Sequence, residues 1–187
     1  MRLFLAINLD PAVRRAVIDA TAELRAAAPT LNWMDESRVH LTLKFLGEQE
    51  VSVAPPLAEA LDRVAYRHRR FTMRISDVGA FPNFRRARVV WMGVDRDSRL
   101  ELLHHDVEVA CDTLGFELEG RAFRPHLTLA RVREHTAEDE LRRLSRASKR
   151  VAFEYESAVD AIDLMRSSIG REGSRYERLH SAVLRAH

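Results

Sequence analysis

The tetrapeptide His-Leu-Thr-Leu occurs twice in this 187-residue chain, at residues 40–43 and again, unchanged, at residues 126–129. Both copies lie in apolar, strand-like stretches, VHLTLKFLG at 39–47 and PHLTLARV at 125–132. Side chains alternate between the two faces of a strand, so the His and Thr of each copy share one face and the leucines share the other. Each copy is therefore predicted to bury its leucines in a core and to present an imidazole and a hydroxyl on the opposite side.

A fold that brings the two strands together places His40, Thr42, His126 and Thr128 around one site. Imidazole titrates near neutral pH, so one copy can hold a proton while the other accepts one. In-line cleavage of a phosphodiester needs such a base for the attacking oxygen and such an acid for the leaving oxygen. The two hydroxyls are suited to hydrogen-bond the non-bridging phosphoryl oxygens. The repeat therefore predicts phosphodiester chemistry without a metal.

Metal binding is the competing use of paired histidines. A catalytic zinc site usually has three protein ligands and an open position, and each tetrapeptide offers Thr, not a carboxylate, beside its His. His104 and His105 lie in a helix-like segment, where adjacent side chains point in directions about 100° apart. We therefore expect no metal and no other cofactor.

Charge and cysteine content limit the function classes. The 30 Lys and Arg against 28 Asp and Glu give a net charge of +2, too small for whole-molecule attraction to nucleic acid. The single cysteine, Cys111, excludes an internal disulfide and lies in a helix-like run, where we expect a core residue. The N-terminus has no signal-peptide pattern, and no 18-residue window is apolar and uncharged. We expect a cytoplasmic protein with no membrane partner, which acts as a monomer.

Periodicity along the chain predicts strands and helices in each half. Helical spacing ends at Gly or Pro signals, and Asp10-Pro11 opens the first helix. The order predicts an α+β fold with a mainly antiparallel sheet. We expect strands at 3–9, 39–47, 71–78, 87–94, 125–132, 151–155, 158–165 and 176–184, and helices at 12–28, 53–67, 99–114 and 136–150.

In order along nearly the whole chain, several stretches resemble the two-histidine (2H) phosphoesterases with paired His-x-Thr motifs. Within that family they are similar to the RNA 2′,3′-cyclic phosphodiesterases, historically called 2′-5′ RNA ligases. The resemblance implies one domain over residues 1–187, bilobal, with a small antiparallel sheet backed by helices and one motif in each lobe, and a cleft between them. The stretches that carry it are MRLFLAINL, Trp33 with VHLTLKFLGE, VGAFPNFRRARVVWMGV, FRPHLTLARV and DLMRSSIGREGSRYERLHSAVL.

The resemblance also implies roles for the motif residues. His126 is the expected general base that activates water, and His40 the expected acid that protonates the ribose 3′-oxygen, which opens the cyclic phosphate to a 2′-phosphate. Thr42 and Thr128 are expected to hold the phosphoryl oxygens. The implied substrates are RNA with 2′,3′-cyclic phosphate ends or nucleoside 2′,3′-cyclic phosphates.

Five further residues are candidates for substrate binding. Arg131 follows the second motif at a position often basic in this family, but its odd offset from His126 requires a strand end or a bulge to reach the cleft. Lys44 has the same parity as His40 and is expected on the cleft rim. In the loop after residue 80, Phe84, Arg85 and Arg86 combine an aromatic ring with cations, which suits base stacking and phosphate contact. The other interpretation of that loop is a solvated segment whose phenylalanines cap the core.

Two other functions use the same residues. One is 2′-5′ ligation, the reverse reaction, in which a 5′-hydroxyl replaces water; both directions share a transition state. The other is a non-catalytic module that binds RNA ends. Arg or Lys would serve binding alone better than paired His-x-Thr segments, which favours catalysis.

Overall fold

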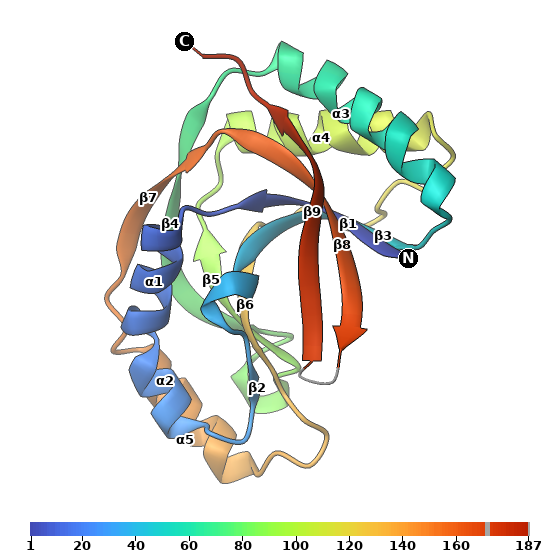
Figure 1. Ribbon diagram of the computed structural model, residues 1–187. Helices are drawn as coiled ribbons and strands as arrows, with labels where there is room; N and C mark the ends of the chain where they lie inside the picture. The colour runs from blue at the N-terminus through green and yellow to red at the C-terminus, as the bar shows by residue number, and fades with distance from the viewer. Residues whose placement is uncertain (171–172, 187) are drawn as a thin grey trace.

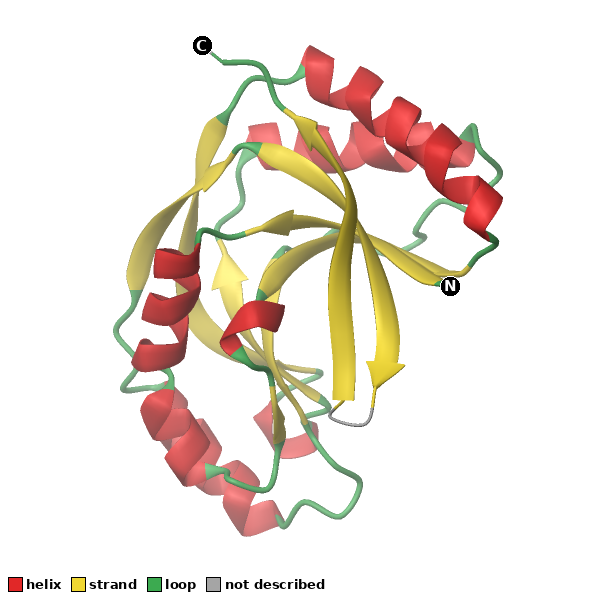
Figure 2. Cartoon of the chain, in the orientation of Figure 1, coloured by secondary structure: helices red, strands yellow, loops and turns green. Residues whose placement is uncertain are grey.

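In the computed structural model, which describes residues 1–170 and 173–186, the strands form one curled antiparallel sheet flanked by helices (Figures 1 and 2). The strand order is β7-β4-β5-β6-β3-β1-β8-β9, and β2 pairs with β6 outside this path. The predicted α+β class and antiparallel sheet are confirmed. The strands are β1 (Arg2–Asn8), β2 (Asn32–Trp33), β3 (His40–Glu48), β4 (Phe71–Phe81), β5 (Val89–Val94), β6 (His126–Arg131), β7 (Glu154–Val159), β8 (Ala161–Gly170) and β9 (Gly173–Val183).

Apart from β2, the sheet consists of two four-stranded halves that meet between β3 and β6. One half has the order β3-β1-β8-β9 and the other the order β6-β5-β4-β7, so each motif strand lies at the inner edge of its own half. The halves are joined through the register pair Leu41–Leu127, which makes them one sheet. Both leucines are fully buried in the main hydrophobic core. The repeat in the sequence thus corresponds to a repeat in the sheet.

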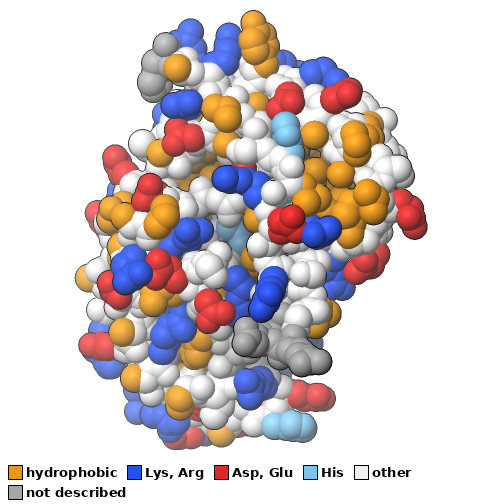
Figure 3. All heavy atoms as spheres, viewed as in Figure 1, with side chains coloured by type: hydrophobic (Ala, Val, Ile, Leu, Met, Phe, Trp, Pro, Cys, Tyr) orange, Lys and Arg blue, Asp and Glu red, His pale blue; other side chains and the backbone are white. Residues whose placement is uncertain are grey.

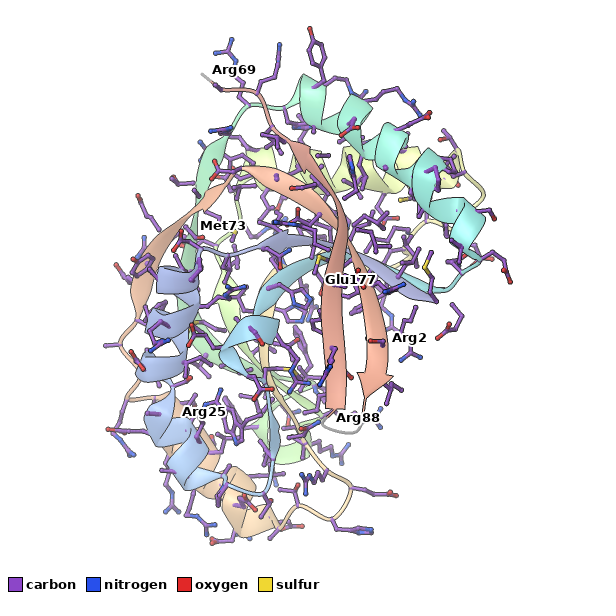
Figure 4. All side chains as sticks on the ribbon, viewed as in Figure 1. Arg2, Arg25, Arg69, Met73, Arg88 and Glu177 are labelled. Carbon is purple, nitrogen blue, oxygen red and sulfur yellow. The ribbon has the colours of Figure 1, made fainter. Side chains whose placement is uncertain are left out.

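Helices flank the sheet in two groups. In Figure 1, α3 and α4 cover the β8-β9 side, and α1, α2 and α5 lie along the β4-β7 side. Arg25 of α2, labelled in Figure 4, lies over the Trp33 ring at 5.0 Å, which ties that helix to β2. The helices are α1 (Pro11–Ala20), α2 (Ala22–Ala27), α3 (Ala54–Arg67), α4 (Ser98–Asp112) and α5 (Glu138–Ser148), with short 3-10 turns η1 (Glu36–Arg38), η2 (Val51–Val53) and η3 (Phe84–Arg86).

Local hydrogen bonds decide where two predicted helices begin or break. The Asp10 carboxylate accepts the Ala12 N–H at 2.8 Å and starts α1 as predicted. The helix expected over 12–28 is interrupted at Thr21, whose hydroxyl donates to the carbonyl of Val17 at 2.8 Å. The helix expected over 136–150 is shorter, because α5 begins only at residue 138, without a side-chain cap, and ends at residue 148.

The final strands differ from their predicted limits. Strand β7 begins at residue 154 and runs through 159, so the strand expected over 151–155 is displaced. Strands β8 and β9 pair from Ala161–Val183 to Gly170–Gly173, so the hairpin extends beyond the strands expected at 158–165 and 176–184; residues 171–172 lie outside the described part of the chain. Cys111 is a buried core residue, and burial raises the pKa of its thiol to about 11, so the thiol stays protonated at neutral pH. No helix in the described ranges is long and apolar enough to span a membrane.

Candidate active site

The structure brings the two motifs together at the centre of the sheet. Leu41 and Leu127 are partners in the β3–β6 register and point into the core. In an antiparallel pair, the residue after one partner lies beside the residue before the other, so the threonine of each motif lies next to the histidine of the other. The two histidines and two threonines are half-buried on the opposite side of the sheet, which we call the motif face. The predicted convergence of the two segments is therefore present in the fold.

Both imidazoles are held in the same way by their own strands. His40 Nδ1 lies 2.8 Å from the carbonyl oxygen of Arg38, and His126 Nδ1 lies 2.7 Å from that of Arg124. A carbonyl only accepts, so each Nδ1 carries the proton as donor, and each Nε2 is left to exchange one. His40 Nε2 lies 3.1 Å from the Thr42 hydroxyl, which has the geometry of a hydrogen bond.

Aromatic rings enclose the His40 imidazole. The Phe4 ring of β1 stacks on it with centroids 5.0 Å apart, and the Tyr176 ring of β9 meets it edge-on at 5.5 Å. Phe4 and Tyr176 also contact each other, so the three rings form one cluster. This packing removes water from the ring and fixes its direction.

His126 is enclosed by a second pair of aromatic rings, from β4 and β5. Phe81 meets the imidazole edge-on at 5.0 Å, and Trp91 lies 6.4 Å from it. The Trp91 ring occupies the space above Gly79, where a Cβ would lie only 2.2 Å from a ring carbon. A residue larger than glycine at position 79 would displace Trp91 and with it one wall of the His126 site.

Burial lowers the pKa of both imidazoles below the ordinary value of 6.5. For His40 the hydrogen bond to the Arg38 carbonyl opposes the effect of burial in part. For His126 the Arg124 carbonyl also opposes it, while the positive charge of Arg131 lowers the pKa further. Both rings are therefore mostly neutral at pH 7 in the free protein, each able to accept a proton at Nε2.

Matching β-bulges follow the two motifs and change the direction of the residues beyond them. In the β1–β3 register Thr42 and Lys44 face consecutive residues of β1, which leaves Leu43 as the extra residue. In the β5–β6 register Leu129 is the extra residue in the same way. After the second bulge Arg131 is exposed on the motif face. The bulge that Arg131 needs in order to lie on the same face as His126 is therefore present.

The expectation that Lys44 lies on the cleft rim is wrong. The bulge at residue 43 turns Lys44 to the core face, where it is 8% exposed. Its ammonium donates to Glu108 Oε2 at 2.7 Å and to the carbonyl of Glu117 at 2.8 Å. The side chain is half of a buried ion pair between β3 and α4 and does not reach the motif face.

Phe45 takes the position on the motif face that simple alternation gave to Lys44. It pairs with Phe4 in the register, its ring lies 6.3 Å from the Phe4 ring, and it is 69% exposed. Most of its ring surface is therefore open to solvent on the motif face. By its place after the bulge, Phe45 is the counterpart of Arg131 in the other half.

A hollow of about 540 Å³ lies beside residues that neighbour His126. Its walls include Trp91, Gly93 and the segment 122–125, and Gly93 is the register partner of His126 on β5. The Ser76 hydroxyl, also in its lining, donates to the Asp95 carboxylate at 2.6 Å. The hollow therefore offers room and polar groups beside Trp91 and Pro125, a ring neighbour and the chain neighbour of His126.

The loop candidates Phe84, Arg85 and Arg86 form η3, just beyond Phe81. Phe84 is half-buried and packs against the main core, as the core-capping interpretation predicts. Both arginines are exposed, and the turn is held by Asn83 Oδ1, which accepts their backbone N–H groups. The segment faces α5 around a separate hollow and does not line the space beside His126.

A sheet whose two central strands each carry a His-x-Thr pair on one face places this protein among the two-histidine phosphoesterases. The family model described as 2′-5′ RNA ligase superfamily matches residues 10–171. The chain belongs to this family.

Curated relatives and solved structures agree with this assignment. A protein of Aeropyrum pernix named RNA 2′,3′-cyclic phosphodiesterase is 34% identical over 148 residues, 79% of this chain and 82% of its own. One of the same name from Geobacillus stearothermophilus is 34% identical over 128 residues, 68% of this chain but only 41% of that relative, so the match spans less than half its length. The structure of E. coli LigT complexed with 3′-AMP is 28% identical, with a TM-score of 0.79 over 98% of this chain and 97% of its own.

Proposed function

We propose that this protein is an RNA 2′,3′-cyclic phosphodiesterase that hydrolyses 2′,3′-cyclic phosphate ends to 2′-phosphomonoesters. The observation that carries the proposal is the pair of imidazoles fixed through Nδ1, each with Nε2 left to exchange a proton and each beside a threonine of the other motif. The relatives from A. pernix and G. stearothermophilus carry the name of this activity, and E. coli LigT binds a nucleoside monophosphate.

The proposed reaction uses one imidazole as base and the other as acid. His126 Nε2 takes a proton from water as the water oxygen bonds to phosphorus. The bond from phosphorus to the ribose 3′-oxygen breaks, and His40 Nε2 donates its proton to that oxygen. The product is a 2′-phosphomonoester with a free 3′-hydroxyl. To return to the starting state, His126 releases its extra proton to solvent and His40 takes one proton from solvent.

Threonine and arginine groups supply the electrostatic part of the proposal. Thr42 and Thr128 donate hydrogen bonds to the non-bridging oxygens, where negative charge resides in the transition state. Arg131, exposed on the motif face, adds a cation for the phosphate, and the exposed Phe45 ring offers a surface on which a nucleobase can stack. The enzyme is proposed to work without metal or cofactor, as a cytoplasmic monomer, on RNA ends or on nucleoside 2′,3′-cyclic phosphates.

Product identity tests the proposal. We expect incubation with a nucleoside 2′,3′-cyclic phosphate to yield only the 2′-phosphate isomer, at the same rate with and without EDTA, because both proton transfers use protein side chains. Chromatography against the authentic 2′- and 3′-monophosphates measures this. A 3′-phosphate product or inhibition by EDTA contradicts the proposal, and no turnover with tight binding identifies a binding module. Adding an RNA with a 5′-hydroxyl end detects 2′-5′ joining in the same assay.

A further inference from the structure

A hollow of about 750 Å³ lies between η3 and α5, separate from the one lined by residues 122–125. Four arginine side chains, one carboxylate and an aromatic ring line it. The lining residues are, from η3 and the residue before it, Asn83, Phe84, Arg85 and Arg86 and, from α5, Glu138, Leu141, Arg142, Ser145 and Arg146. Figure 3 shows Lys and Arg side chains spread over the whole visible face among acidic side chains, including its lower part, where α2 and α5 lie in Figure 1.

The charges around this hollow are not balanced. Four guanidinium groups face one carboxylate, and that carboxylate, Glu138, lies 3.4 Å from Arg142 in an i,i+4 pair. Within residues 1–170 and 173–186, the side chains of Arg85, Arg86 and Arg146 form no ion pair, and all three are exposed. Cations that converge on a concave surface without acidic partners attract a polyanion.

The position of the hollow connects it to the catalytic histidines. The ring of Phe81 contacts His126, and Phe84 follows three residues later, a chain length of at most about 10 Å. An RNA whose end lies at His126 therefore has its neighbouring phosphates within reach of this hollow. Arginine is the side chain best suited to bind phosphate through two parallel hydrogen bonds.

We infer that the hollow between η3 and α5 is an accessory site for RNA backbone phosphate, so that the enzyme prefers RNA oligomers to mononucleotides. The inference rests on the proposed function and adds a substrate class to it. Arg85 and Arg86 contribute from the loop, Arg142 and Arg146 contribute from α5, and the edge of the Phe84 ring forms part of the wall. A mononucleotide held at the histidines is too short to fill both sites.

The double variant Arg142→Gln/Arg146→Gln tests the site. We expect kcat/KM for a cyclic-phosphate-ended RNA oligomer to fall roughly tenfold more than kcat/KM for the nucleoside 2′,3′-cyclic phosphate. The dependence of log Kd on log salt for an oligomer ending in a 2′-phosphate should become shallower, by about 1.4 if both cations contact phosphate. The matched control is Arg143→Gln/Arg150→Gln, which removes the same charge from arginines that pair elsewhere, with Asp139 and Glu23.

The outcomes separate this inference from the proposed function. If the wild-type enzyme hydrolyses both substrates and neither the kcat/KM ratio nor the salt slope changes in the hollow variant, the accessory site is wrong and the function stands. A change of equal size in the control variant also overturns the site, because it reflects net charge alone. If the wild-type enzyme hydrolyses neither substrate but the hollow variant alone loses affinity for the oligomer, the proposed function fails and the site stands.

Discussion

Replacing His126 or His40 by alanine is expected to lower kcat for a nucleoside 2′,3′-cyclic phosphate by about 10²- to 10⁴-fold in each case. The loss corresponds to roughly 3–5 kcal/mol of transition-state stabilisation at about 1.36 kcal/mol for each factor of ten. Each ring is proposed to carry one of the two proton transfers, and each is held by its own Nδ1 hydrogen bond. Steady-state kinetics with the purified variants measures the effect.

Two further variants make the test specific. The double variant His40→Ala/His126→Ala should lose much less than the product of the two single losses, because the rings act as a unit in one step. His135→Ala, which removes an exposed imidazole from a loop, should retain wild-type kcat. Near-normal turnover in either single motif variant would contradict the two-imidazole mechanism.

Replacing Lys44 by methionine is expected to destabilise the fold by about 3–5 kcal/mol. Methionine fills a similar volume but leaves the Glu108 carboxylate buried without its cation. Stabilities of about 5–15 kcal/mol are usual for domains, so the loss is a large share of the total. Urea unfolding followed by circular dichroism measures the change. Where the variant is folded, kcat/KM should stay near the wild-type value, because Lys44 is on the core face.

The matched control removes both charges of the buried pair. Lys44→Met/Glu108→Met should recover most of the lost stability, because an apolar pair of similar volume has no charge to desolvate. His104, whose Nε2 lies 3.8 Å from Glu108, is unchanged in both variants. Equal stability of Lys44→Met and the wild-type protein would show that the ion pair is not needed. Selective loss of substrate affinity in Lys44→Met would instead restore the cleft-rim interpretation.

The essential geometry of the motifs was predictable because it needs only local rules. Alternation along a strand is enough to place Leu41 and Leu127 in the core and the four polar residues on the other face. The repeat itself indicated that the two strands serve one site. Their pairing through a single register contact at the centre of the sheet is a tertiary feature, which no local pattern encodes.

The residues beyond the motifs were harder to place because a bulge reverses the parity. The extra residue at Leu43 sends Lys44 inward and Phe45 outward, and the extra residue at Leu129 brings Arg131 to the motif face. Bulges arise from pairing with the neighbouring strand, so a single strand's sequence does not reveal them. One signal was available in the sequence. Ala130 is apolar and Arg131 is charged, which indicates an alanine that points to the core and an arginine that points outward. Ala130 follows the second motif as Lys44 follows the first, so a buried Ala130 indicates that Lys44 also points inward.

The residues that enclose the imidazoles depend on long-range register. Phe4 and Tyr176 are 36 and 136 residues from His40 in the chain, and their contact follows from the neighbouring strands β1, β8 and β9. The hollow between η3 and α5 likewise joins Arg85 and Arg146 from distant segments. Sequence pattern identified the loop half of this cluster but not its partner helix.

The pH dependence of kcat/KM tests the central claim most directly, because it reports the protonation of both imidazoles in the free enzyme. The active form has one ring protonated and one neutral, and burial lowers both pKa values below 6.5. We predict a bell-shaped profile of kcat/KM with its maximum below pH 6.5. Above that maximum kcat/KM falls as pH rises, because both rings become neutral. His126→Ala should lose the acidic limb of the profile, and His40→Ala the alkaline limb. A flat profile, or both limbs retained in both variants, would contradict the account.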